Sequence, residues 1–171
     1  MNRWTVSLHE AAHAVAAWEL TGRRATATLH QGGSGAAWPL EDMSPTDNAI
    51  MTAAGPLAEA LADRYPAPEI AQPVAGGTPP ELPTVESVAT TETAAELRRE
   101  MARAAPDHVV LARFCIGGIE DQPERWAKRH AWIRSVAERL IRSHERSIIE
   151  AARVLYLRGV VSVPLEERNA S

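Results

Sequence analysis

The sequence has 171 residues, a formal net charge of −4 and a hydrophobic content of 45%, which suits one globular domain that buries a core without disulfide bonds. Basic and acidic residues are interleaved along the chain, so neither a nucleic-acid surface nor a polybasic membrane patch is expected. No run of 18 apolar residues is present to cross a membrane, and the single cysteine, Cys115, fits a reducing compartment. These features predict a cytoplasmic protein.

The first predicted elements are a helix and a hairpin. Residues 5–20 are rich in Ala and Leu without Gly or Pro, which predicts a helix, and Thr21-Gly22 ends it. Residues 24–30 alternate like a short strand. A glycine-rich turn at residues 31–35 then leads to a return strand at residues 36–39.

A second helix is predicted to follow the hairpin. Ser44-Pro45 with Asp47 is typical of a helix start, and the helix should reach about Tyr65, with a bend or break at Gly55-Pro56. Residues 66–87 contain six of the twelve prolines and no periodicity, which predicts a flexible loop.

The C-terminal half is predicted to be helical. A capping box at residues 93–96 opens a helix over residues 91–104, and Pro106 starts another helix that Gly117-Gly118 ends. One long helix then runs from Asp121 towards Arg158, followed by a short tail at residues 160–171.

Residues 9–13, His-Glu-Ala-Ala-His, match the pattern H-E-x-x-H inside the first predicted helix. Residues four apart lie on one face of a helix, so His9 and His13 can bind a single ion. Glu10 is rotated by about 100° from His9, which keeps it out of the ligand set but beside water at the ion. The pattern predicts a zinc site with His9 and His13 as ligands and Glu10 as the base for peptide hydrolysis.

A zinc site of this kind needs a third protein ligand. In metzincins this ligand follows the second His by six residues, where Glu19 stands, but Ala16 replaces the helix-breaking glycine. An unbroken helix points Glu19 away from the ion, so we reject that class. Thermolysin-like enzymes use the Glu of an E-x-x-x-D pattern on a second helix, and Glu59 with Asp63 fits those letters.

Residues 4–65 resemble the peptidase domain of FtsH-type AAA proteases. The resemblance lies in LHEAAHAVAAWEL at residues 8–20, the strand and turn after it, and IMTAAGPLAEAL at residues 50–61. In that family the third ligand is an Asp at the start of the next helix, and residues 90–92, Thr-Thr-Glu, stand at the matching place. The resemblance therefore implies Glu92 as the third ligand, with Glu59 as the second choice and Glu86 as the third. The chain departs from the family by this Glu for Asp and by Ala12 for Gly.

The resemblance implies a zinc metalloendopeptidase that lacks its own ATPase, because no G-x-x-x-x-G-K-[ST] phosphate loop is present and Lys128 is the only lysine. Its substrates would be peptides, unfolded proteins, or proteins delivered by an ATPase or regulatory partner, and a homo-oligomer is left open. Two alternatives stay open as well. One is a catalytically retired zinc-binding interaction module, and the other is a regulatory protease specific for one partner.

The expected fold over residues 1–171 is a single, mainly helical α+β domain of the zincin type. Residues 1–65 would hold the catalytic helix, an edge β-hairpin and the Gly-Pro helix, and residues 88–171 would form a helical bundle. The strand at residues 25–29 would bind substrate by strand addition at the edge of the sheet.

Overall fold

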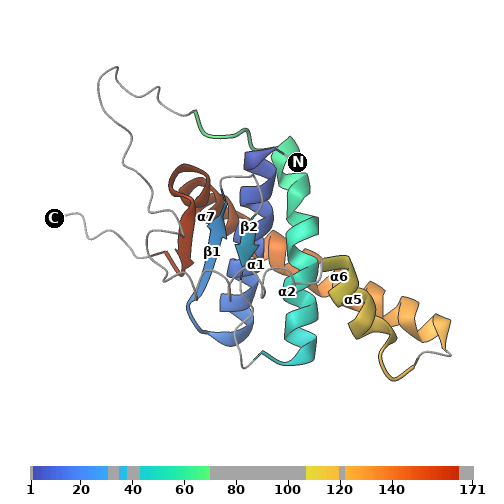
Figure 1. The fold of residues 1–171 in the computed structure, drawn as a ribbon. Helices are drawn as coiled ribbons and strands as arrows, with labels where there is room; N and C mark the ends of the chain where they lie inside the picture. Colours follow the sequence, from blue (N-terminus) through green and yellow to red (C-terminus); the bar gives the residue numbers. More distant parts are fainter. Residues whose placement is uncertain (1, 31–34, 38–42, 70–106, 120–121, 166–171) are drawn as a thin grey trace, which may run out of the picture. The chain divides into compact units, whose positions relative to one another are not determined.

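The computed structural model describes residues 2–30, 35–37, 43–69, 107–119 and 122–165. The chain divides into two compact units, residues 1–68 with 107–171, and residues 69–106. The first unit is mainly helical with a small antiparallel sheet of three strands (Figure 1), which confirms the prediction of a mainly helical fold with a small sheet. The loop predicted over residues 66–87, beyond residue 69, and the helix predicted over residues 91–104 lie outside the described residues.

The first helix, α1 (Arg3–Thr21), is the central helix of this unit. Asn2 caps its start, where Oδ1 accepts the Thr5 N–H at 2.8 Å, and Gly22 ends it in the left-handed conformation. Twelve of its nineteen residues are buried, and five of these are alanines. Such small side chains let α2, α7 and the sheet pack closely against it, so the polar side chains on α1 are shielded from water.

The sheet contains β1 (Ala25–Leu29), β2 (Gly35–Ala37) and β3 (Val160–Val163) in the order β2-β1-β3. The predicted hairpin of β1 and β2 is confirmed, but the prediction that residues 25–29 form the edge strand is wrong. β3 pairs with the other side of β1, with Val161 opposite Ala27. Val161 and Val163 are buried whereas Val160 is exposed, so burial of alternate valines fixes this strand against the core.

The second helix, α2 (Pro45–Ala58), begins where Ser44-Pro45 predicted. The Ser44 side chain accepts the Asp47 N–H at 3.1 Å and caps the helix. Pro56 lies inside the helix without ending it, and the chain tightens three residues later into a 3-10 helix, η1 (Glu59–Asp63). The helix therefore does not break at Gly55-Pro56, and its type changes at Glu59 instead.

In the described residues after position 106 the chain forms three helices, α5 (Asp107–Ile116), α6 (Pro123–Ser143) and α7 (Glu145–Arg158). The prediction of one helix from Asp121 to Arg158 is wrong, because the chain changes direction at His144, whose φ is −116°. The two helices have different partners, since α6 packs mainly on α2 and α7 packs mainly on α1. Tertiary packing thus separates two segments that share helical periodicity.

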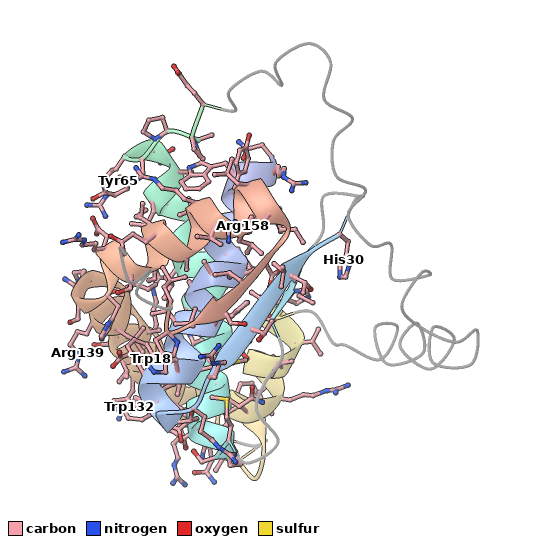
Figure 2. All side chains as sticks on the ribbon, turned by 90° about the vertical axis from the view of Figure 1, so that its left-hand side faces the viewer. Trp18, His30, Tyr65, Trp132, Arg139 and Arg158 are labelled. Atoms are coloured by element: carbon pink, nitrogen blue, oxygen red, sulfur yellow. The ribbon has the colours of Figure 1, made fainter. Side chains whose placement is uncertain are left out.

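Among the residues that the structure describes, the core consists of two groups of apolar side chains. The larger surrounds α1 and includes Leu8, Ile148 and Leu155, all fully buried. The smaller joins Ile133 of α6 to Ile50 of α2. Figure 2 shows the side chains between the helices and the outward side chains around them. Within the described ranges, no helix is long and apolar enough to cross a membrane.

Candidate metal centre

His9 and His13 lie one turn apart on α1, as H-E-x-x-H predicts. Their ring centroids are 4.7 Å apart and the ring planes are nearly perpendicular, at 83°. The His13 side chain is 6% exposed and that of His9 is 16% exposed. Two imidazoles are therefore held side by side in a largely buried environment, where unpaired polar atoms are costly.

Asp107, the first residue of α5, completes the group. Its Oδ2 lies 2.9 Å from His9 Nε2 and 3.2 Å from His13 Nε2. The three candidate ligand atoms lie within 4.8 Å of one another, so the group could hold a metal ion. Sequence reasoning missed Asp107. The available signal was Pro106-Asp107 at a helix start, which is the context that the resembling family requires of its third ligand.

The second nitrogen of each imidazole contacts the segment formed by α2 and η1. His13 Nδ1 lies 2.8 Å from the carbonyl oxygen of Met51, and His9 Nδ1 lies 2.8 Å from Glu59 Oε1. A carbonyl oxygen only accepts, so His13 Nδ1 carries a proton and its Nε2 faces Asp107. Such partners on the far nitrogen orient histidine ligands in metal sites.

Gly55 of α2 lies directly against the two rings. A Cβ atom at this position would lie 2.4 Å from His13 Cε1 and Nε2 and 2.8 Å from His9 Nε2. These distances are far below van der Waals contact, so any side chain would displace the imidazoles. The Gly-Pro segment of the sequence is therefore explained by close approach of α2 to the ligand atoms.

Glu10 lies next to the three ligand residues but outside their group. Its residue is 7% exposed, and its side chain runs against Gly35 of β2. Burial raises the pKa of Glu10 above its ordinary value, while His13, His9 and a hydrogen bond from the Ala37 N–H oppose the rise. A buried carboxylate with a raised pKa beside a cation site has the properties of a general base.

The charges of the group are strongly coupled. Burial lowers the pKa of His9, but the hydrogen bonds with Asp107 and Glu59 outweigh it and raise the value to about 8. Burial would raise the pKa of Asp107, yet its hydrogen bonds with His13 and His9 depress it well below its usual range. Without a metal ion, the group therefore keeps a proton between imidazole and carboxylate that a cation would have to displace.

Two imidazoles and one carboxylate form a donor set that suits zinc with one position open. In a tetrahedral site with bonds of about 2.0–2.1 Å the ligand atoms are about 3.3 Å apart. The separations from Asp107 Oδ2, 2.9 Å and 3.2 Å, need to grow by only a few tenths of an ångström. These two separations therefore suit a metal ion bound at such distances.

The group of His9, His13 and Asp107 contains none of the carboxylates named from the sequence that the structure describes. Glu92 and Glu86 lie outside the described residues, so Glu92 stays a prediction. Glu59 contacts His9 Nδ1, on the side away from Asp107. Glu19, which we rejected, lies 3.3 Å from His144 Nε2.

Comparisons with known proteins add no further assignment: no protein-family model matches the chain, and no curated protein or solved structure is significantly similar to it. The resemblance to FtsH-type peptidases accordingly depends on the motifs alone. The geometry around His9, His13 and Asp107 is the observation on which a functional proposal can be built.

Proposed function

We propose that this protein is a zinc-dependent endopeptidase, with His9, His13 and Asp107 as the ligands and Glu10 as the base. The observation that carries the proposal is the orientation of the two imidazoles. Each Nδ1 has a protein partner on one side, and both Nε2 atoms converge with Asp107 Oδ2 on the other. Glu10 stands beside this convergence without belonging to it, which is the arrangement that hydrolysis requires.

The protein groups have distinct tasks in this proposal. Zinc, when bound, would supply a Lewis acid and lower the pKa of a bound water to about 7. Glu10 takes a proton from water and later passes it to the amine that leaves when the peptide bond breaks. Its burial favours the proton-bearing state between these two steps. Glu59 and the Met51 carbonyl keep the imidazoles turned towards the ion.

Substrate would bind along β2 rather than β1. β1 is hydrogen-bonded on both sides, whereas no described strand lies beyond β2 in the sheet. β2 also runs past Glu10, since a Cβ on Gly35 would lie 2.9 Å from the carboxylate oxygen Oε1. An extended peptide added to β2 would thus bring its backbone to the base. Unfolded or partner-delivered chains are the substrate class that suits main-chain recognition.

The test combines metal analysis with one conservative substitution. Purified protein should contain about one zinc per chain and cleave an unstructured peptide library. Glu10→Gln removes the base and leaves the ligands, so zinc should remain while hydrolysis is lost. His13→Ala is the matched control, because it should lose both zinc and hydrolysis. Zinc retention together with wild-type cleavage by Glu10→Gln would show that Glu10 is not the base. A zinc-loaded wild type without cleavage would instead favour a zinc-binding interaction module.

A further inference from the structure

The two sides of β2 are not equivalent. Along β1, Leu29 donates its N–H at 2.7 Å to the carbonyl that precedes β3. Backbone groups alternate in direction along a strand, so Thr28 points its N–H and C=O towards β2, where Ala36 is its partner. Gly35 and Ala37 flank that partner, so their N–H and C=O groups point away from β1. They form the outer edge of the sheet.

Glu10 makes two contacts with this outer edge. The Ala37 N–H donates a hydrogen bond to its carboxylate. A Cβ on Gly35 would lie 2.4 Å from Glu10 Cγ and 2.9 Å from Cδ. Cγ is the first atom beyond Cβ, so a larger residue at position 35 would force the whole Glu10 side chain to rotate, and not only its end. Gly35 thus limits the movement of the Glu10 side chain, and the Ala37 N–H binds its carboxylate.

We propose that Gly35 and Ala37 are positioning residues for Glu10, and that β2 fixes the carboxylate beside the metal centre without letting it become a ligand. This inference rests on the proposed function of Glu10 as the base. The Glu10 side chain has three rotatable torsions, and a bound cation attracts its charge. A coordinating Glu10 would fill the position at which water has to bind. The Ala37 hydrogen bond and the close contact with Gly35 oppose that movement.

A double-mutant cycle in metal-free protein tests the contact without requiring hydrolysis. Gly35→Ala should lower the midpoint of thermal unfolding by about 2–10 °C, because the added methyl overpacks the Glu10 side chain. In a Glu10→Ala chain the same methyl meets no Cγ. There the midpoint should not fall, since Ala also restricts the unfolded chain. An equal fall in both chains would overturn the role of Gly35.

Ala37→Pro tests the hydrogen bond. It removes an N–H on the outer edge of the sheet, where a strand tolerates proline. It leaves the hydrogen bonds between β2 and β1 in place. In zinc-loaded protein we expect kcat to fall about 10–100-fold, as for other outer partners of metal sites, while zinc content stays unchanged. The matched variant Ala36→Pro removes a bond to Thr28 and should lower the thermal midpoint instead.

The outcomes separate this inference from the proposed function. Wild-type kcat in Ala37→Pro would overturn positioning by β2. If the zinc-loaded wild type does not cleave peptides, the proposed function fails, and the thermal cycle between Gly35 and Glu10 still decides whether β2 holds the carboxylate.

Discussion

Replacing Asp107 with Asn keeps the size of the side chain and removes its charge. In metal-free protein Asp107 Oδ2 lies 2.9 Å from His9 Nε2, and its hydrogen bond is the largest of the contributions that raise the pKa of His9 from 6.5 to about 8. The rise from 6.5 to about 8 corresponds to about 2 kcal/mol in favour of the protonated imidazole. We expect Asp107→Asn to remove this contribution and so to lower the pKa of His9 towards its ordinary value of 6.5. An NMR titration of the imidazole in zinc-free protein measures this change.

The same variant decides between the candidate third ligands when zinc affinity is measured by competition with a chelator. Loss of a ligand should weaken binding by more than the roughly 10–100-fold that an outer partner costs. Asp107→Asn should exceed that range, Glu59→Gln should fall within it, and Glu92→Gln should leave affinity unchanged. Strong zinc binding in Asp107→Asn, together with zinc loss in Glu92→Gln, would refute the assignment and restore the choice that the family resemblance implied.

Two further predictions follow from the same geometry. Gly55→Ala should abolish tight zinc binding, as measured by competition with a chelator. Its Cβ would lie 2.4 Å from His13 Nε2 and 2.8 Å from His9 Nε2, whereas the distances between an ion and its ligands tolerate changes of only about 0.2 Å. Zinc affinity equal to that of the wild type would contradict this prediction. The raised pKa of His9 means that its stabilisation of metal-free protein is fully present below pH 6.5 and is lost as the pH rises through about 8. The free energy of unfolding in urea should therefore be about 2 kcal/mol smaller at pH 9 than at pH 6. Asp107→Asn should flatten this pH dependence.

The local parts of this fold were predictable because their signals are local. The helix that carries His9 and His13, its end at Gly22 and the Ser44-Pro45 start of α2 all depend on residues within one or two turns. β3 was missed because its four residues gain stability only by burial of Val161 and Val163 against distant elements. The break at His144 carries no Gly or Pro, and only the different partners of α6 and α7 explain it.

The candidate site likewise has a part that the local sequence predicts and a part that depends on distant packing. His9, Glu10 and His13 could be assigned from spacing on one helix, since the geometry of a helix fixes their relative directions. Asp107 stands 94 positions after His13 in the sequence (107 − 13). No periodicity connects two residues so far apart, and several other carboxylates were compatible with the sequence. Only packing of α5 against α2 brings Asp107 to the imidazoles.

The position of Asp107 also changes how the ion would act on the chain as a whole. Cys115 is the only buried residue of α5, and Leu111 and Phe114 pack on the core while only partly buried, so this short helix contributes few buried apolar side chains. An ion shared by His13 and Asp107 would close a ring of about 94 residues, and a cross-link of that span restricts the unfolded chain by about 4–5 kcal/mol in the chain-entropy description. In a chain with one cysteine, the metal would serve as the staple that a disulfide provides elsewhere, and uptake of the ion would be coupled to the docking of α5.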